Sequence, residues 1–290
     1  AERTEQAVQE LVSLRQGAQA KGLLLDVSKE DSIKSAVAQT VADFGRLDVL
    51  INATNLSIGK RVEELTAPEF ERSLRTNLVG NFLLAREAAR AIWDDLTLAK
   101  MYVTGGIGPS GSNEGFTTAY DLPNDTAYAE TCAAIGLFLW MHRLTQLERD
   151  GKYVDVMERA LFNGILSGLS QDGIHFFYEN PLAVDRQNER FRRKPHHRQP
   201  WYGTACCPPN IARLLASLGS YIYSAGRNEA VVQLYIASEA TLQIADQEVT
   251  LKQATNYPWD GTVTITVGPE HPANFAVLLR LPGWCSRFSL

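Results

Sequence analysis

The chain has 290 residues, enough to bury a sizeable core in one large domain or two to three ordinary ones. Its 45% hydrophobic and 21% charged residues are typical of a soluble globular protein, and no apolar run reaches membrane-spanning length. The formal net charge of −5 argues against a nucleic-acid partner, which usually needs a basic surface.

Cysteine usage and the first residues indicate the compartment. Residues 1–6 show no charged-then-apolar signal pattern. The chain has only four cysteines, and two of them are adjacent, so a disulfide framework is not expected. A reducing cytoplasm is the simplest expectation.

The first predicted region, residues 1–91, alternates strand and helix patterns. Apolar runs at 22–27 and 48–52 are typical of buried parallel strands. Helices are predicted over 28–44 and 66–90. The order strand, helix, strand, helix implies a parallel sheet, and so a partial α/β, Rossmann-like segment.

The helix predicted over 28–44 has both a start signal and an apolar face. Ser28 with Asp31 resembles a capping box. One inward face is expected to carry Ile33, Val37, Val41 and Phe44.

This region resembles the middle of a short-chain dehydrogenase. Asp26-Val27 matches the strand end that lies beside the adenine in that family, and residues 44–52 match the run into its Asn-Asn-Ala-Gly motif. Asn77 matches the asparagine of the catalytic tetrad. The motif's glycine is absent from residues 53–55, and no tyrosine has a lysine four residues later, so the proton-transfer pair is missing. Turnover as a dehydrogenase is not expected.

A glycine-rich stretch at residues 106–111 fits the G-x-G-x-x-G pattern, but no helix is predicted after it to receive a pyrophosphate. Nucleotide binding there is not expected. The glycines are better explained as allowing a loop that carries Glu114 to fold tightly.

Three further helices are predicted over 125–148, 153–169 and 208–224, the last opened by two prolines that suit a first helical turn. His142 lies in the first of them and is expected to be packed rather than a ligand. From residue 230 the hydrophobic period becomes two, which predicts a β-sandwich. Its strands are expected at 231–236, 241–244, 249–251 and 262–267.

Basic residues concentrate in residues 185–198. A solvated loop is the default interpretation, because charged side chains are mostly exposed. The functional alternative is a polar lid over a sugar site, with Trp201 and Tyr202 offering apolar faces and hydrogen-bonding groups.

Two short motifs hold three of the four cysteines. Cys206 and Cys207 precede the proline pair, and Cys132 follows Glu130 by two residues. Thiolates and a carboxylate suit Zn²⁺, although buried cysteines can also be packing residues without chemistry. Residues two apart lie on different sides of a regular helix, so if Glu130 and Cys132 share one ion, the backbone there must be a helix start or irregular. The fourth, Cys285, is expected to pack in the sandwich.

From about residue 92 to residue 290 the chain resembles glycoside hydrolase family 127, the cysteine-dependent β-L-arabinofuranosidases. The matching stretches are 93–96, 101–108, 120–124, 127–136, 155–159, 176–178 and 205–213. The resemblance implies a partial (α/α)₆ barrel ahead of an antiparallel β-sandwich. It implies Zn²⁺ held by Glu130, Cys132, Cys206 and Cys207, with Cys206 as nucleophile and Glu114 as general acid/base.

The sequence therefore predicts a mixed fold with three parts: residues 1–91, a catalytic helical portion at 92–225, and a truncated sandwich at 226–290. The predicted function is a retaining glycoside hydrolase that acts on a small carbohydrate and releases a terminal L-arabinofuranose or similar sugar. The alternatives are an inactive zinc-binding or carbohydrate-binding remnant, and an NAD(P)-dependent dehydrogenase fragment. No membrane partner is expected. A homodimer is expected to cover apolar surface that the partial sheet and partial barrel leave exposed.

Overall fold

The structure is a computed structural model that describes residues 2–183 and 197–290. The chain divides into two compact units, Ala1–Ala99 and Lys100–Leu290. None of the helices in the described ranges combines the length and apolarity needed to cross a bilayer.

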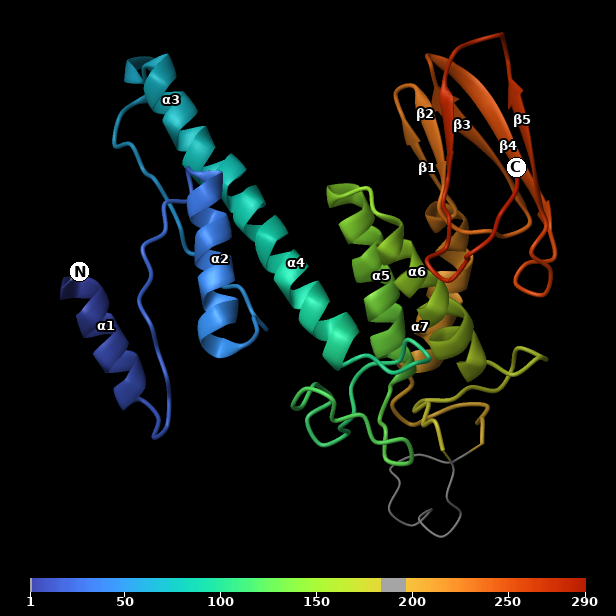
Figure 1. Cartoon of the computed structure of the whole chain (residues 1–290), viewed down its shortest axis with the longest axis horizontal. Coiled ribbons are helices and arrows are strands. Elements are labelled where there is room, and N and C mark those ends of the chain that lie inside the picture. The colour runs from blue at the N-terminus through green and yellow to red at the C-terminus, as the bar shows by residue number, and fades with distance from the viewer. Residues whose placement is uncertain (1, 184–196) are drawn as a thin grey trace. The chain divides into compact units, whose positions relative to one another are not determined.

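The first unit is helical in its described part. Its elements are α1 (Glu2–Ser13), α2 (Glu30–Phe44), a 3₁₀ turn η1 (Val62–Glu64), α3 (Ala67–Leu74), a π-helical turn η2 (Arg75–Gly80) and α4 (Asn81–Ala99). The last three elements follow one another without a break and form a single long helix (Figure 1).

A capping box that sequence reasoning missed starts this long helix. The Thr66 hydroxyl and backbone N–H both donate to the Glu69 carboxylate, at 2.9 and 3.0 Å. The π-helical turn brings Gly80 against the chain before α2, where an added Cβ would lie 2.3 Å from the Val27 carbonyl oxygen. Only glycine allows this approach.

The core of the unit forms where α2 lies along α4 (Figure 1). Its buried members are Val27, Ile33, Leu83 and Leu84. An ion pair of 2.7 Å between Arg86 and Glu30 joins the two helices at the edge of this core. The predicted inward face of α2 is confirmed for Ile33, which is fully buried, whereas Phe44 is exposed.

The two parallel strands predicted at 22–27 and 48–52 do not form. Residues 2–99 contain no strand, and both segments run as irregular chain with Leu24 and Ile51 97% and 87% exposed. A strand is stable only when a neighbour satisfies its backbone groups, and neither segment is paired here. The predicted capping box is also wrong, because the Ser28 hydroxyl donates to Asp26 rather than capping α2.

The second unit begins with loops and continues with helices. These are α5 (Thr131–Leu147), α6 (Gly151–Arg159), a π-helical turn η3 (Ala160–Ile165), a 3₁₀ turn η4 (Leu166–Gly168), α7 (Cys207–Ser217) and a 3₁₀ turn η6 (Leu218–Tyr221). Helix α5 packs on α6 and α7. It starts six residues later than predicted, because Ala129 takes a positive φ of 35° and Glu130 is extended. His142 is packed, as predicted: its ring lies edge-on to Tyr221 at 4.8 Å, and burial lowers its pKa.

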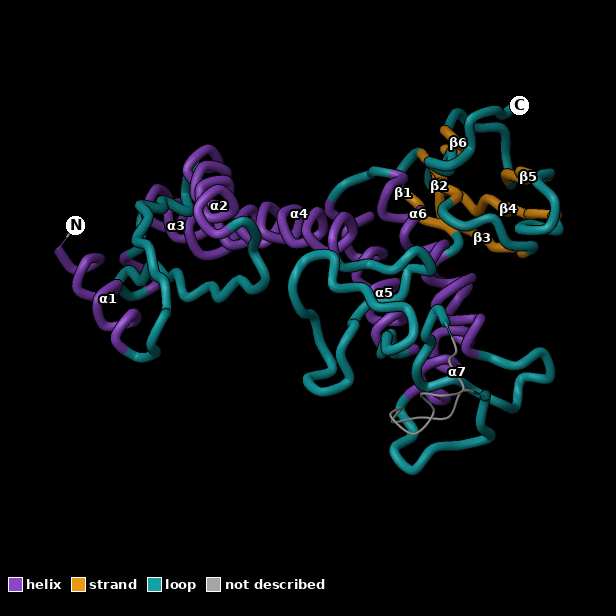
Figure 2. Tube along the Cα trace, turned by 60° about the horizontal axis from the view of Figure 1, so that its bottom comes forward, coloured by secondary structure: helices purple, strands orange, loops and turns teal. Residues whose placement is uncertain are grey.

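The described strands gather near the C-terminal end of this unit (Figure 2). They are β1 (Tyr223–Gly226), β2 (Glu229–Val232), β3 (Ser238–Ile244), β4 (Gln247–Thr255), β5 (Val263–Pro269) and β6 (Ala276–Leu279). One sheet has the order β1-β2-β6 and the other β3-β4-β5. Their pairings are antiparallel except that of β2 with β6, which is parallel.

The expectation of a mixed fold, helices followed by largely antiparallel sheets, is confirmed at this level. Strands β1 and β6 were not predicted from the sequence, and β2 ends at Val232 rather than at residue 236. The closed (α/α)₆ barrel, the β-sandwich and the boundary at residue 225 stay predictions.

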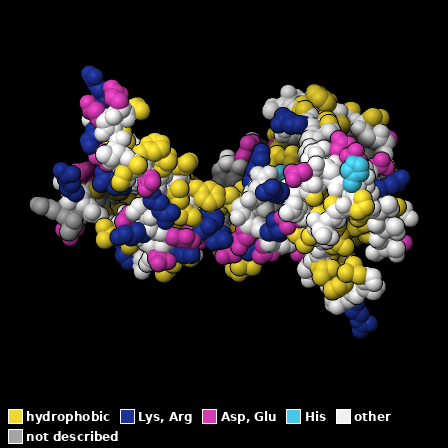
Figure 3. Space-filling view, turned by 90° about the horizontal axis from the view of Figure 1, so that it is seen from above, with side chains coloured by type: hydrophobic (Ala, Val, Ile, Leu, Met, Phe, Trp, Pro, Cys, Tyr) yellow, Lys and Arg dark blue, Asp and Glu magenta, His cyan; other side chains and the backbone are white. Residues whose placement is uncertain are grey.

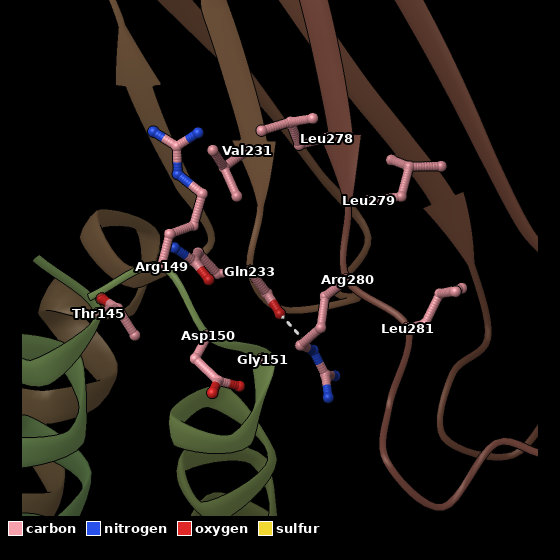
Figure 4. Close-up of a pocket in the computed structure, with 10 residues that line it drawn as sticks. All are labelled: Thr145, Arg149, Asp150, Gly151, Val231, Gln233, Leu278, Leu279, Arg280 and Leu281. Carbon is pink, nitrogen blue, oxygen red and sulfur yellow. Dashed lines mark hydrogen bonds between the residues drawn. The ribbon is translucent and has the colours of Figure 1, made fainter.

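Arg280 joins the strands to helix α6. It directly follows β6, and its Nε donates to the Gln233 carbonyl oxygen at 2.9 Å (Figure 4). Its guanidinium, 3% exposed, forms ion pairs with Asp155, at 2.5 Å, and with Glu158. Such a pair is costly to break from one side, because the remaining carboxylates stay buried without their cation.

We therefore expect Arg280→Met to lower the free energy of unfolding of the second unit by about 3–5 kcal/mol. Arg149→Met is the matched control, since the ion pair of Arg149 with Glu229 is largely exposed and should contribute less than about 1 kcal/mol. Urea denaturation followed by circular dichroism measures both. An equal loss of unfolding free energy in the two variants would show that the buried Arg280 ion pairs stabilise the unit no more than the Arg149 ion pair does.

The apolar surface of the first unit generates a second prediction. Hydrophobic side chains gather on its surface (Figure 3), and Leu24, Val49 and Ile51 are among the exposed ones. Contiguous apolar surface favours association. We expect the chain to form a dimer in light scattering and Ile51→Asp to weaken it, whereas Phe288→Asp in the second unit should not. A monodisperse monomer of the unaltered chain would overturn this prediction.

Candidate metal centre

The four residues predicted to bind metal converge in the structure. Glu130, Cys132, Cys206 and Cys207 each present one donor atom, and these atoms all lie within 4.8 Å of one another. Cys207 is buried and the other three are half-buried. Two segments that lie far apart in the sequence therefore build one cluster.

The first segment is the start of α5. Glu130 has extended backbone and occupies the position before the helix, and Cys132 lies in the first turn. This is the helix start that a shared ion requires of two residues spaced two apart. The segment is fixed by pairing with residues 178–180, where the Thr131 N–H donates to the Tyr178 carbonyl oxygen at 3.0 Å.

The second segment is the start of α7. Cys206 directly precedes the helix and Cys207 is its first residue. The two prolines that follow lie in the first turn, where the backbone needs no N–H donor. The Asn210 N–H donates to the Cys206 carbonyl oxygen at 3.2 Å, which closes that turn over the thiols.

The separations suit a tetrahedral ion. The Sγ atoms of Cys132 and Cys207 are 3.4 Å apart, and those of Cys206 and Cys207 are 3.7 Å apart. The Cys206 Sγ lies 3.1 Å from Glu130 Oε1. Four ligands at zinc–sulfur distances of about 2.3 Å would be separated by about 3.8 Å. The donor set and its spacing therefore fit a metal ion.

The three thiols differ in acidity. The hydrogen bond between Cys132 and Cys207, aided by the Asn210 amide 3.0 Å from the Cys132 Sγ, lowers the pKa of Cys132 to about 7. Burial raises the pKa of Cys206, and the pKa of Cys207 is raised by its hydrogen bond to Cys132 and by burial. A thiolate at Cys132 thus makes ionisation of Cys206 and Cys207 less favourable. A bound cation would lower the pKa of all three thiols.

Tyrosine side chains surround the cluster, and sequence reasoning gave no role to two of them, Tyr128 and Tyr178. The Tyr178 hydroxyl accepts from the Cys206 thiol at 3.1 Å. Its ring packs at 5.4 Å from that of Tyr202 and at 6.4 Å from that of Tyr128. Burial raises the pKa of Tyr178 and of Tyr128, which keeps both hydroxyls protonated. The sequence signal was their position inside the family-matching stretches 127–136 and 176–178, without a spacing that specifies a contact.

Glu114 lies outside the four-atom cluster but is linked to it. It is exposed on a tight loop closed by a bridge between Ser110 and Gly115, and its own φ is 48°. Its Oε1 accepts from the Tyr128 hydroxyl at 3.3 Å. The predicted use of glycine is seen at Gly108, whose φ is 85°. The loop therefore presents a carboxylate beside the tyrosines that border Cys206.

Other predicted residues fall elsewhere. Most of the basic segment 185–198 lies outside the described residues, so the lid stays a prediction. Tyr202 is buried and its hydroxyl donates to the Phe176 carbonyl oxygen at 2.7 Å, so it does not present the open face that was expected, whereas Trp201 is 62% exposed. The Cys285 thiol lies 3.1 Å from the Arg287 carbonyl oxygen and is not part of the cluster.

Comparison with known families gives three matches along the chain. Residues 76–220 match the model of the β-L-arabinofuranosidase GH127 catalytic domain, and residues 229–290 match that of the GH127 middle domain. Residues 1–96 match the short-chain dehydrogenase family.

Individual relatives agree with the GH127 matches. A non-reducing end β-L-arabinofuranosidase of Bifidobacterium longum subsp. longum is 40% identical over 206 residues, which are 68% of this chain and 31% of the relative. The solved structure of a GH127 β-L-arabinofuranosidase from Geobacillus stearothermophilus T6 is 49% identical with a TM-score of 0.68, covering 72% of this chain and 33% of that one. A second solved structure, of a GH127 β-arabinofuranosidase, is 32% identical with a TM-score of 0.65. The match covers 95% of this chain and 45% of that one. The chain thus spans about a third of the length of the curated relative.

The cluster predicts metal binding that depends on its thiols. We expect purified chain to retain about one divalent metal ion, measured by inductively coupled plasma mass spectrometry after dialysis. Cys207→Ser should lose most of it, because a hydroxyl replaces a thiolate ligand. Cys285→Ser is the matched control and should keep the metal. Equal metal content in the two variants would show that the cluster is not the site.

Proposed function

The chain belongs to the GH127 family of β-L-arabinofuranosidases, and from this premise we propose that it is a retaining glycoside hydrolase that releases a terminal L-arabinofuranose or similar sugar. The observation that carries the proposal is the convergence of Glu130, Cys132, Cys206 and Cys207 beside a loop that carries Glu114. A small carbohydrate is the proposed substrate.

We propose zinc as the ion, because three thiols and one carboxylate are the donor set that a borderline-soft, tetrahedral cation prefers. Glu130, Cys132, Cys206 and Cys207 would hold it. When bound, it would supply the positive charge that keeps the thiols deprotonated at neutral pH. A reducing compartment such as the cytoplasm would keep the adjacent Cys206 and Cys207 available as ligands.

Cys206 is the proposed nucleophile. Its thiol is only half-buried, in contrast to the buried Cys207, and the Tyr178 hydroxyl lies 3.1 Å from its Sγ. The Cys206 thiolate would attack the anomeric carbon as the bond to the departing oxygen breaks. The product of this step is a sugar joined to sulfur through its anomeric carbon.

Glu114 is the proposed general acid/base. It would donate its proton to the departing oxygen in the first step and take a proton from water in the second, when that water displaces Cys206. Two displacements at the same carbon retain the anomeric configuration. Tyr128, which donates to Glu114 at 3.3 Å, would orient the carboxylate from the side of the thiols.

A metal-binding or sugar-binding remnant without turnover is the second candidate. It is considered because the match covers 31% of the length of the curated relative, so the activity of that whole protein is a proposal for this chain. The same cluster would then hold its ion without releasing sugar, and metal content with no hydrolysis would identify this case.

A dehydrogenase function for residues 1–96 has less support. Asn77 matches the tetrad asparagine, but its side chain is occupied by the backbone of Leu56. Its amide oxygen accepts from the Leu56 N–H at 2.7 Å, and its amide nitrogen donates to the Leu56 carbonyl oxygen at 2.8 Å. The tyrosine and lysine of the proton-transfer pair are absent from the sequence. Titration with NADH would test this alternative, and saturable binding would restore it.

The hydrolase proposal predicts loss of activity at two separate residues. With 4-nitrophenyl β-L-arabinofuranoside as substrate, Cys206→Ser should fall to background, because the hydroxyl is far less ionised than a thiolate. Glu114→Gln should slow turnover about 10²–10⁴-fold while its metal content stays unchanged. Proton NMR of the first product should show the β anomer.

Cys285→Ser is the activity control, since its thiol lies outside the cluster, and it should match the unaltered chain. Activity in Cys206→Ser equal to that of this control would exclude Cys206 as nucleophile. An α anomer as first product would exclude the two-displacement mechanism.

A further inference from the structure

A second pocket lies in the Lys100–Leu290 unit, away from the cysteines. Its volume is about 1,060 Å³. It is bordered by α6, η3 and η4 on one side, and by the β4–β5 connection and the chain after β6 on the other. None of the proposed metal or catalytic residues lines it. We call it the aromatic pocket.

Aromatic side chains form one wall of the aromatic pocket. The rings of Tyr257 and Trp284 are stacked, with centroids 6.5 Å apart and planes inclined by 19°. Phe162 meets Tyr257 edge-on at 6.2 Å. Trp259 and Trp284 are 93% and 65% exposed, so two indole faces are open to solvent. Two exposed indoles that line one pocket make an apolar patch, and an apolar patch beside polar groups often marks a binding site.

A buried polar network holds this wall in place. Glu158, which is 6% exposed, accepts from the Tyr257 hydroxyl at 2.8 Å and from the Trp284 indole N–H at 3.4 Å. Arg280 in turn holds Glu158 and Asp155, and Asp155 also accepts from the Gly283 N–H at 2.9 Å. The orientation of the Tyr257 and Trp284 rings is therefore fixed before any ligand binds, which lowers the entropic cost of binding.

The charge and polarity of the aromatic pocket define the class of ligand. Its carboxylates, Asp155 and Glu158, are already paired with Arg280, so neither is available to a cationic ligand. The exposed Arg159 also lines the pocket, and its guanidinium adds further hydrogen-bond donors. Uncharged hydrogen-bonding groups line the opposite side: Asn163, Ser167 and Gln171, all of them exposed. Flat aromatic faces match the weakly positive C–H groups of a sugar ring, and amides and hydroxyls match its hydroxyls. The pocket thus suits a hydroxyl-rich sugar better than a cationic or purely apolar ligand.

We propose that the aromatic pocket binds a hydroxyl-rich sugar residue of an oligosaccharide, at a site separate from Cys206. Trp259 and Trp284 supply the stacking faces. Asn163 and Ser167 supply mainly their side-chain oxygens as acceptors, because both side chains already donate to backbone carbonyl oxygens, and Gln171 supplies a donor and an acceptor. The site does not rest on the proposed hydrolase activity, since it shares no residue with the metal cluster. It would hold part of a carbohydrate chain whether or not the cysteines cleave a glycosidic bond.

The test is calorimetric titration of the full 290-residue chain with α-1,5-linked arabinotriose and, separately, with xylotriose. We expect at least one of them to bind weakly, with a dissociation constant in the millimolar range. Trp259→Ala should weaken that binding at least about fivefold, because a stacking face is lost. Trp259 is 93% exposed, so its removal should leave the melting temperature unchanged. Trp284→Ala should weaken the same binding.

Two control variants distinguish sugar binding in the aromatic pocket from binding elsewhere on the chain. Phe288→Ala removes another exposed aromatic ring outside the pocket and should bind as the unaltered chain does. Cys206→Ser should also retain binding. No heat of binding with either sugar would overturn the proposal, as would binding that survives Trp259→Ala but is lost in Cys206→Ser. A change in self-association in Trp259→Ala with sugar binding unaltered would identify a protein contact instead and would also overturn it.

Discussion

The approach of two helix starts is the constraint on which the candidate site depends. Three sulfurs and one carboxylate can lie within 4.8 Å only if α5 and α7 begin at the same place, and each start has its own local cause. Glu130 is held extended by pairing with residues 178–180, and the proline pair allows α7 to begin directly at Cys207. The pairing that fixes Glu130 also delivers the Tyr178 hydroxyl to Cys206. The two helix starts thus bring the four donor atoms together, and the pairing at Glu130 also places Tyr178 beside Cys206.

A second constraint, the buried Arg280, organises another region of the same unit. Its ion pairs with Asp155 and Glu158 join the chain after β6 to α6. Glu158 in turn accepts hydrogen bonds from Tyr257 and Trp284, which orients both rings. A fully buried arginine with two carboxylates is seldom the most stable solution, since well-packed apolar residues often serve as well. What the network does provide is a pair of hydrogen bonds that fix the orientation of Tyr257 and Trp284.

The sequence predicted the grouping of the cluster residues better than the fold around them. Residue types with strong, specific chemistry carry their signal locally, so Cys132, Cys206 and Cys207 could be grouped from two short motifs and a family resemblance. The expectation that Glu130 and Cys132 need a helix start follows from helical geometry alone and agrees with the structure. The role of Tyr178 could not be predicted, because its contact with Cys206 joins residues 28 apart whose spacing follows no rule. The partners of Arg280 are more than 120 residues away, which places them beyond any local pattern.

The two strand predictions in the first unit were wrong because local composition does not show whether a strand finds a partner. Residues 22–27 and 48–52 have the apolar composition of buried parallel strands, yet Leu24 and Ile51 are almost fully exposed. Helical patterns nearby were predicted correctly because a helix satisfies its own backbone hydrogen bonds, and α2 needs only α4 to cover its apolar face. A strand depends on a neighbouring strand for its backbone hydrogen bonds, so an apolar composition alone does not ensure that a strand forms. The strands β3, β4 and β5 are consecutive in the chain, and each pairs with a strand next to it in sequence, whereas a parallel strand must find its partner beyond a crossover.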